Sequence, residues 1–343
     1  MINIIKNLLR ANLANSLTTQ KMNFVESNKI YTFGSKNRNK SFYIIKRKFN
    51  ANGMFSNLRF VLDHLIYAKK KKFVPIIDMQ NFPTVYNEKK KIHNSYNAWN
   101  YYFKSINKYD LKEIYNSKNV IFSTDTTLRK LEIDKDKYAQ NFCKKYIKVN
   151  KSIINKYKLL EKNIFEKKNK VMGVHIRGTL QRIVSGHSLP PKPKDIVMEC
   201  DKIFNKYNCK KIFLVTEDLI YYKKFKSFFK DKLITLNTPR SKPNVFGNHN
   251  EHFTKYNRSL HRYKLGEESI IDSLLLAKTN VFLYTDSNIW RFSVIFSKNK
   301  QIKYQFTTDN NSKNFLLSRW KWYLHYYLPF IFGDIKYKLK GSK

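Results

Sequence analysis

A histidine and an arginine stand directly after a short, valine-rich apolar run in VMGVHIRGTL, residues 171–180. Such a run is typical of a buried parallel strand, and Gly178 permits a sharp exit from it. His175 and Arg177 are therefore expected at the carboxyl end of a strand, which is where open α/β sheets bind their ligands. An arginine can donate two parallel hydrogen bonds to phosphate oxygens, so this stretch predicts a phosphate site.

A second pattern suited to phosphate lies in TDSNIWR, residues 285–291, directly after another expected strand. Asp286 or Ser287 is predicted to be the N-cap of a helix that begins near Asn288. A hydroxyl, an amide, free backbone N–H groups and, one turn later, Arg291 would complement the charge of a diphosphate. An ordinary helix cap is the simpler interpretation of Ser287 and Asn288 alone, but two such patterns at two strand ends favour a pyrophosphate.

Acidic positions accompany these basic ones. Glu217 and Asp218 close an expected strand at 211–216 and open a helix, where negative charge is favourable in any case. Asp272 lies in the most regular stretch of the chain, 266–296, which indicates a helix, a strand, a turn and a second helix. Asp272 can be either a ligand-binding carboxylate or an exposed helix residue.

The elements that must carry these residues alternate between strand and helix. In the first half we expect a strand at 41–46, a helix from Asn57 and a strand at 73–77, with Gly53 in the loop before the helix. This order is typical of a parallel α/β domain. Backbone N–H groups beside Gly53 could approach an anion, although a lone glycine is more often only a turn. Further strands are expected at 119–122, 211–216 and 233–236, and helices at 137–160, 193–207 and 219–229.

The composition indicates a globular protein, and the net charge has two possible explanations. The chain has 343 residues, 42% of them apolar, which is enough for two domains of ordinary size. Its formal charge of +42 favours a polyanionic partner such as nucleic acid, anionic lipid or a phosphorylated substrate. Heavy use of Lys, Asn, Ile, Phe and Tyr is also what an AT-rich genome produces, so mutational bias explains the charge equally well. The sequence contains no RRM, KH or zinc-finger pattern.

The cysteines and the hydropathy indicate the compartment. Cys143, Cys200 and Cys209 are odd in number and lack metal-binding spacing. We therefore expect no disulfide framework, no metal site and a reducing, cytosolic location. No apolar run reaches the roughly 18 residues of a membrane-spanning helix, so the chain is not expected to cross a bilayer.

Both ends of the chain combine basic and apolar residues. Residues 1–13 repeat Ile and Leu around Lys6 and Arg10, which suits a transit peptide, a helix on a membrane surface or a frayed terminus. The segment RWKWYLHYYLPFIF at 319–332 could lie on an anionic membrane surface with its rings at the headgroup level. Packing across a domain interface is the alternative for this segment.

Six short motifs follow one another in a defined order. They are GMFSNL (53–58), HIRG (175–178), PPKP (190–193), FLVTED (213–218), GEESIIDSLLLAKTN (266–280) and TDSNIWR (285–291). This order resembles the α1,6- and O-fucosyltransferase superfamily, above all its bacterial polysaccharide-type members, over most of residues 50–330. The resemblance implies an α/β enzyme of the GT-B class, with two Rossmann-like domains facing across a cleft. It further implies inverting transfer from a GDP-sugar, held mainly by the second domain without a bound metal, in polysaccharide biosynthesis.

The resemblance also implies roles for individual residues. Arg177 would neutralise the β-phosphate while the glycosidic C–O bond breaks, in place of a divalent cation. Asp272 and His175 would read the guanine, because a carboxylate can accept from the two adjacent N–H donors on that base edge. The remaining donor-binding residues are predicted to be Glu217, Asp218, Ser287, Asn288 and Arg291, together with the turn at Gly53.

One part of the pattern departs from the superfamily. Many members carry H-x-R-R-T-D, with a second arginine and an aspartate, whereas this chain has Gly178 and Leu180 at those places. No carboxylate follows Leu180 until Asp195, so His187 in the loop SGHSLPP is the predicted general base. An exposed loop histidine is the alternative interpretation of His187, and Glu217 is the reserve base.

Four segments are predicted: a basic extension at 1–40, an acceptor-side domain at 41–165, a nucleotide-sugar domain at 166–312 and an aromatic, basic helical segment at 313–343. The predicted activity is transfer of fucose, or another sugar, from a GDP-sugar to a glycan or glycolipid by a cytoplasmic protein peripheral to the membrane. Two alternatives stay open. The chain could instead bind nucleic acid or another polyanion, as its charge favours, or bind GDP without turnover, as Leu180 suggests.

Overall fold

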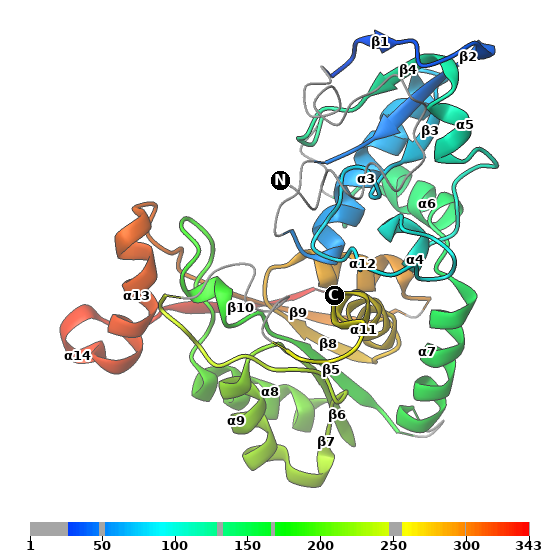
Figure 1. The fold of residues 1–343 in the computed structure, drawn as a ribbon. Helices are drawn as coiled ribbons and strands as arrows, with labels where there is room; N and C mark the ends of the chain where they lie inside the picture. The colour runs from blue at the N-terminus through cyan, green and yellow to red at the C-terminus, as the bar shows by residue number, and fades with distance from the viewer. Residues whose placement is uncertain are drawn as a thin grey trace. The chain divides into compact units, whose positions relative to one another are not determined.

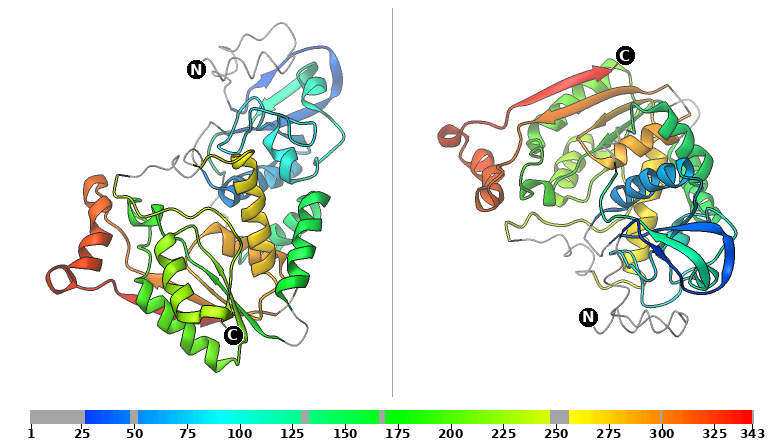
Figure 2. Two further views of the ribbon diagram at one scale, coloured as in Figure 1. Left: turned by 60° about the horizontal axis from the view of Figure 1, so that its bottom comes forward. Right: turned by 90° about the horizontal axis from the view of Figure 1, so that it is seen from above.

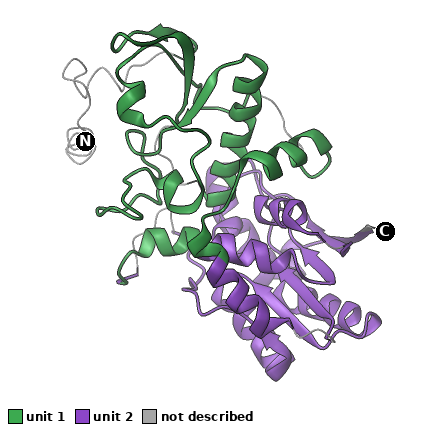
Figure 3. Ribbon diagram, turned by 90° about the vertical axis from the view of Figure 1, so that its right-hand side faces the viewer, with its two compact units in different colours: residues 1–154, 258–267 green, residues 155–257, 268–343 purple. Residues whose placement is uncertain are grey.

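The computed structural model describes residues 27–47, 52–128, 133–165, 169–246, 256–298 and 300–342 (Figure 1). The chain divides into two compact units, coloured separately in Figure 3: Met1–Ile154 with Arg258–Glu267, and Asn155–Asn257 with Glu268–Lys343. Each unit is built on its own β-sheet. The amphipathic stretch predicted at 1–13 lies outside the described residues.

A four-stranded sheet in the order β1-β4-β2-β3 forms the centre of the first unit. Its strands are β1 (Ile30–Tyr31), β2 (Lys36–Ile45), β3 (Val74–Ile77) and β4 (Ser117–Phe122). β2 pairs in parallel with β3 and β4, and β1 runs antiparallel to β4. Residues 42–45 of β2 are buried, as the apolar run in this central strand requires. β1 and the start of β2 fall within the predicted extension 1–40, so that part of the extension belongs to the sheet.

Among the helices of the first unit, the one expected from Asn57 begins at Met54, the one expected from Lys137 begins there, and two short helices were not predicted. The helices are α3 (Met54–Lys70), α4 (Ala98–Tyr102), α5 (Leu111–Ile114) and α6 (Lys137–Tyr146). The helix predicted at 137–160 is interrupted, and a second helix, α7, covers Lys151–Ile164. The chain between them is extended because Val149 forms a β-bridge with Phe103. Backbone groups that a continuous helix would pair internally are thus paired with another segment.

The second unit contains a six-stranded sheet in the order β10-β9-β8-β5-β6-β7. Its strands are β5 (Val171–His175), β6 (Lys211–Val215), β7 (Leu233–Ile234), β8 (Val281–Tyr284), β9 (Ile302–Thr308) and β10 (Tyr337–Ser342). β5 pairs in parallel with β6 and β8, and His175 lies opposite both Val215 and Tyr284. The three strands therefore end level with one another, at one edge of the sheet.

The second unit has helices on both faces of its sheet and at its margin (Figure 2). They are α7, α8 (Pro193–Lys206), α9 (Leu219–Phe229), α11 (His261–Leu276), α12 (Asn288–Phe296), α13 (Phe315–Tyr327) and α14 (Pro329–Phe332), with 3-10 turns η1 (Leu180–Arg182) and η2 (Lys230–Lys232). Met172 and Val174 of β5 join the core that contains residues of α8 and α9. Gly173 points to the opposite face, where an added Cβ would lie 2.7 Å from the Thr279 Oγ1 just after α11. This alternation produces a doubly wound α/β unit.

The observed units differ from the predicted segments at three further places. Most of α7 belongs to the second unit, and residues 258–267 belong to the first. The segment 313–343 is not separate, because β10 pairs with β9 and extends the second sheet. Both views in Figure 2 place α13 and α14 at the margin of the second unit opposite α7. Among the helices that the structure describes, none is long and apolar enough to span a membrane.

Candidate functional site

The exits of β5 and β8 are tied together in the second unit. The backbone N–H of Arg177 donates to Thr285 Oγ1 at 3.1 Å, and the N–H of Thr285 donates to the His175 carbonyl at 3.0 Å. The Arg177 side chain is exposed. The level strand ends thus present a guanidinium to solvent from a fixed backbone. Sequence reasoning missed Thr285, although its position directly after a strand is the kind of signal that identified Arg177.

His175 and Ser287, which were predicted to serve different parts of the donor, contact each other. The buried His175 ring has its Nδ1 3.3 Å from Ser287 Oγ. Burial, with help from the charge of Arg177, lowers the pKa of His175 to about 3, so the imidazole is neutral at physiological pH. Ser287 is the N-cap of α12 as predicted, but its hydroxyl makes no capping bond. The first-turn N–H groups of α12 therefore remain without a side-chain cap and can meet an anion.

Arg291 already has protein partners beside that helix terminus. Its guanidinium donates to the Ser287 carbonyl at 2.9 Å and pairs with Asp286 at 2.9 Å. It also lies over the Trp290 ring, at 4.8 Å from the centroid. Asn288, the first residue of α12, is half-buried next to this cluster. Arg291 is thus held in place near the predicted diphosphate position, with its charge partly balanced by Asp286.

Glu217 lies close to Arg177 and to the loop that follows β5. Its Oε1 accepts from the backbone N–H of Gly178 at 2.9 Å and from the Thr179 hydroxyl at 3.4 Å. Burial raises the pKa of Glu217, and the nearby Arg177 opposes that shift. The structure therefore joins the carboxylate at the end of β6 to the loop that follows β5.

Asp218 takes a structural position rather than the predicted donor-binding one. It is fully buried, its Oδ1 accepts from the Ile220 N–H at 2.8 Å to cap α9, and its Oδ2 pairs with Arg182. Both carboxylate oxygens are therefore used inside the fold. The predicted role for Asp218 in the donor pocket is replaced by this capping and pairing role.

The same carboxylate leaves no room for a side chain at position 178. A Cβ added at Gly178 would lie 2.4 Å from Asp218 Oδ2 and 2.5 Å from Asp218 Cβ, so no side chain fits there. Arg182, four residues later, is buried and stacks 4.2 Å from the Trp322 ring centroid. Sequence reasoning missed Arg182, because nothing local in GTLQR indicates that its charge is buried.

Asp272 on α11 lies within the electrostatic influence of Arg240, an arginine that the sequence did not single out. Burial, and then the charge of Glu268, raises the pKa of Asp272 to about 8, although Arg240 acts in the opposite direction. Arg240 donates to the Leu236 carbonyl at 2.9 Å and lies 4.1 Å above the Tyr222 ring centroid. Asp272 is thus neither an ordinary exposed helix residue nor a fully ionised carboxylate at neutral pH. The only feature of the sequence that could have identified Arg240 is its position shortly after the predicted strand at 233–236.

Two predicted residues lie apart from these contacts. His187 is an exposed loop residue whose backbone carbonyl accepts from the Asn311 N–H at 2.7 Å. The small pocket that Arg177 lines is bounded by the neighbouring Ser188 and does not include His187. Gly53 belongs to the first unit, where it is the N-cap of α3 with extended backbone.

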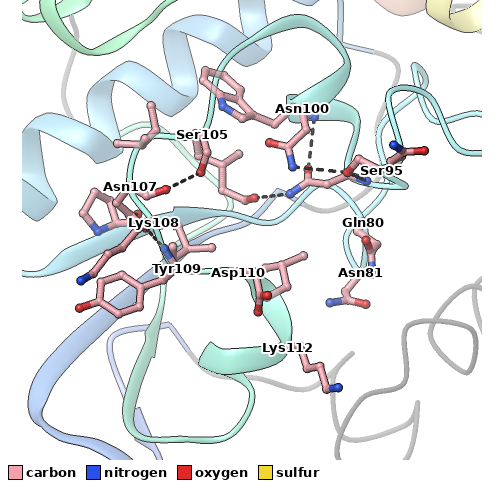
Figure 4. Close-up of a pocket in the computed structure, with 18 of the residues that line it drawn as sticks. Gln80, Asn81, Ser95, Asn100, Ser105, Asn107, Lys108, Tyr109, Asp110 and Lys112 are labelled. Atoms are coloured by element: carbon pink, nitrogen blue, oxygen red, sulfur yellow. Dashed lines mark hydrogen bonds between the residues drawn. The ribbon is translucent and has the colours of Figure 1, made fainter.

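A larger cavity of about 640 Å³ lies within the first unit, beside the edge strand β3 (Figure 4). Its walls are rich in side-chain amides: Gln80, Asn81, Asn94, Asn97, Asn100 and Asn107. Part of this set builds the wall, since Asn97 Nδ2 donates to the Ile77 carbonyl and Asn107 Nδ2 to the Pro75 carbonyl. Asn81 Oδ1 is buried without a hydrogen-bond partner in the structure as described. The cavity thus combines amide donors and acceptors in a volume that suits a small-molecule ligand.

Groups of three or more His, Cys, Asp or Glu side chains that could hold a metal ion are absent from the described residues. Cys143, Cys200 and Cys209 are free and buried.

The two α/β units, with parallel strands at the centre of each sheet, define the fold class, and comparison with known proteins identifies it. No protein-family model and no curated protein sequence matches the chain. Among solved structures, the NodZ α1,6-fucosyltransferase soaked with GDP-fucose matches 89% of this chain and 100% of its own, with a TM-score of 0.50 and 13% identity. The chain therefore has a fucosyltransferase-like fold of the GT-B class, and that prediction is confirmed.

Two further solved structures are similar at lower scores. NodZ from Bradyrhizobium covers 78% of this chain and 95% of its own, with a TM-score of 0.49 and 13% identity. Arabidopsis thaliana FUT1 in complex with GDP covers 87% of this chain and 77% of its own, with a TM-score of 0.42 and 9% identity.

Proposed function

We propose that this chain is a glycosyltransferase that transfers a sugar from a GDP-sugar, with fucose as the sugar, to a glycan or glycolipid. The observation that carries this proposal is the convergence at three level strand ends of the second unit. Arg177 follows β5, Glu217 follows β6, and the uncapped N-terminus of α12 follows β8. The fold adds support, since the similar NodZ structure was obtained after soaking with GDP-fucose.

The chemistry we propose is a single inverting displacement. The oxygen of an acceptor hydroxyl attacks the anomeric carbon, and the bond between that carbon and the β-phosphate oxygen breaks, leaving its electron pair on GDP. The exposed Arg177 guanidinium and the first N–H groups of α12 would stabilise the charge that develops on this phosphate. In this proposal fixed protein donors act on the leaving group and no bound metal takes part.

The acceptor proton needs a base within hydrogen-bond reach. His187 remains our first candidate, because it is exposed and adjacent to Ser188, which lines the pocket beside Arg177. Glu217 is the second candidate, since burial raises its pKa in the direction that a base acting near neutral pH needs.

Guanine recognition is proposed for Asp272 with His175. An ionised Asp272 can accept from two adjacent N–H donors of guanine, and uracil offers no such pair. Arg240 opposes the effect of burial on the pKa of Asp272 and so favours the ionised form. A neutral His175 fixed by Ser287 would contribute a hydrogen bond and no charge.

For the acceptor we propose the amide-lined cavity of the first unit. Hydroxyl groups of a glycan both donate and accept, as amides do, so Gln80, Asn81 and Asn100 are suited to such a ligand. The proposed setting is the cytoplasmic face of a membrane in polysaccharide biosynthesis.

A direct assay tests the enzymatic proposal. Purified protein is incubated with GDP-fucose, with and without candidate glycans, and released GDP is measured. We expect GDP release in the wild type and a large loss in Arg177→Lys, which keeps the charge but loses the forked geometry. Full activity in Arg177→Lys would remove Arg177 from the catalytic role. Absence of both GDP release and GDP binding would refute the proposal, whereas GDP binding without release would indicate a degenerate transferase.

The charge of +42 favours one competing function, binding to nucleic acid or another polyanion. Such binding weakens steeply with salt, because it depends on release of counterions from phosphates. GDP binding that persists at high salt and disappears in Arg177→Ala would contradict this alternative.

A further inference from the structure

The C-terminal helices carry a concentrated apolar surface. The part of the chain that the structure describes has seventeen exposed large apolar side chains, and eight of them fall within residues 315–332. These eight are Phe315, Leu316, Leu317, Trp320, Tyr327 and the three residues 330–332, which we call the C-terminal apolar surface. Exposed apolar residues are ordinary when scattered, but a contiguous set marks an interaction site.

Helical periodicity separates this surface from the side of α13 that holds the helix in place. Ser318 and Trp322, four residues apart, are fully buried, and the Trp322 indole N–H donates to the Pro190 carbonyl at 2.9 Å. Leu316 and Trp320, also four residues apart, are 69% and 47% exposed. One face of α13 therefore fixes the helix to the second unit, and the other presents apolar side chains outward.

The surface continues beyond α13. Phe330, at 80% exposure, and Ile331, at 63%, project from the short helix α14 that follows. Figures 1 and 2 show α13 and α14 together at the margin of the second unit opposite α7. Trp320 also contacts the Phe246 ring edge-on, with the ring centroids 6.0 Å apart, and both side chains remain exposed.

The charge of the same segment restricts what that partner can be. Between residues 313 and 340 there are six lysines and arginines and one acid, Asp334, which pairs with Lys192. A second copy of this chain, with its own +42, would be repelled by so basic a margin. An anionic bilayer offers both negative headgroups and hydrocarbon, which aliphatic side chains such as Leu316 and Ile331 prefer to stacked bases.

We propose that the C-terminal apolar surface docks the protein on an anionic lipid bilayer. Lysines and arginines of the segment attract the headgroups, while Trp320 and the residues of α14 enter the boundary between headgroups and acyl chains. Membrane docking and sugar transfer are tested independently. Binding to vesicles without sugar transfer would support docking alone, and sugar transfer without binding to vesicles would support the proposed transferase alone.

The tryptophans provide a built-in reporter of docking. The chain has four, and Trp99, Trp290 and Trp322 are 3%, 6% and 0% exposed. A blue shift of the emission and protection from acrylamide on addition of vesicles would therefore report chiefly on Trp320. We expect both effects with phosphatidylcholine mixed with phosphatidylglycerol, and little effect with phosphatidylcholine alone.

Matched substitutions test the surface in a vesicle co-sedimentation assay of the full chain. Phe332→Ser should lower the affinity for the mixed vesicles about tenfold. Phe228→Ser is the matched control on α9, because Phe228 is 43% exposed and Phe332 is 44% exposed. It should leave the affinity for the mixed vesicles unchanged. Phe330→Ser provides a second test, and circular dichroism checks that each variant is folded.

Three results would overturn the proposal. One is the absence of binding to the mixed vesicles, and another is an equal loss of binding in Phe228→Ser and Phe332→Ser. The third is a lipid-free dimer that Trp320→Ser abolishes, since it would identify a second copy of the chain as the partner.

Discussion

The two sheets of this protein use the carboxyl ends of their strands in opposite ways. At the end of β3 in the first unit, the buried Asp78 accepts from the N–H of Gln80 and from both nitrogens of Asn81 at 2.9–3.1 Å. It also accepts from the Tyr115 hydroxyl at 2.8 Å. At the end of β5 in the second unit, only the backbone of Arg177 is tied down, and its guanidinium is exposed.

The difference shows that position on a sheet does not by itself make a binding site. At the end of β3 the Asp78 carboxylate is paired within the local structure, although the neighbouring Asn81 Oδ1 has no partner among the described residues. At the end of β5 the backbone of Arg177 is fixed and its charged side chain is exposed, whereas Asp218 after β6 is buried and paired.

Gly178→Ala should be strongly destabilising. The new Cβ would displace Asp218 from its buried pair with Arg182, and disrupting such a pair costs about 3–5 kcal/mol. The free energy of unfolding from urea denaturation measures this. Gly53→Ala is the matched control, because the nearest atom to its added Cβ is 4.0 Å away and its φ is −64°. A change of more than about 1 kcal/mol in the control would weaken the steric explanation.

Asp78→Ala should lower stability without affecting nucleotide binding. Its removal leaves buried donors of Asn81 and Tyr115 unpaired, at a cost of about 2–3 kcal/mol. The same urea titration measures this loss, and calorimetry on the folded fraction should give an unchanged affinity for GDP. A variant as stable as the wild type would show that the first unit does not depend on this strand-end network.

Arg177→Ala should have the opposite profile. We expect transfer from GDP-fucose to fall about a hundredfold, or ~2.7 kcal/mol, because a donor to the developing charge is lost. The unfolding free energy should be nearly unchanged, since the side chain is exposed. Arg38→Ala removes another exposed arginine, in the first unit, and should leave transfer intact. Equal losses in both variants would point to general charge instead of a site.

Affinity for GDP should rise with pH up to about 8. With a pKa of about 8, Asp272 is largely protonated at neutral pH, and guanine recognition requires the carboxylate, so binding releases a proton. The affinity for GDP should rise by at most about tenfold per pH unit. The stability of the nucleotide-free protein should instead fall as the pH rises. The raised pKa of Asp272 stabilises the fold at low pH, and that contribution is lost as the pH rises through about 8.

Asp272→Asn serves as the reference for that experiment. Its GDP affinity should be lower and should follow only the ionisation of the nucleotide phosphate. Identical pH profiles for Asp272→Asn and the wild type would show that Asp272 does not read the base. His175 does not contribute to this profile, since its pKa of about 3 lies far below the range.

The sequence was sufficient to predict four of the strands in the second sheet, β5 to β8, whereas β9 and β10 were not predicted. Apolar runs such as 171–175 are buried, and α9 covers the predicted 219–229, because local hydrophobic pattern and helix signals agree there. The strand-end positions of Arg177, Glu217 and Ser287 follow from the same pattern. These are local properties, and local sequence encodes them.

What the sequence could not predict depends on contacts between distant residues. The pair of Arg182 with Asp218 joins positions 36 apart and converts a predicted ligand-binding acid into a structural one. The contact of Ser287 with His175 spans 112 positions and removes the hydroxyl from the helix terminus it was expected to cap. The bridge between Phe103 and Val149 interrupts a helix that the pattern at 137–160 favours.

A thermal-shift comparison of GDP with UDP, ADP and CMP determines whether the strand ends of the second unit form a guanine-nucleotide diphosphate site. We predict that GDP stabilises the wild type most, that the order persists at high salt, and that Arg177→Ala loses the GDP shift. Equal shifts with all four nucleotides, retained in Arg177→Ala, or no shift with any of them, would contradict the account.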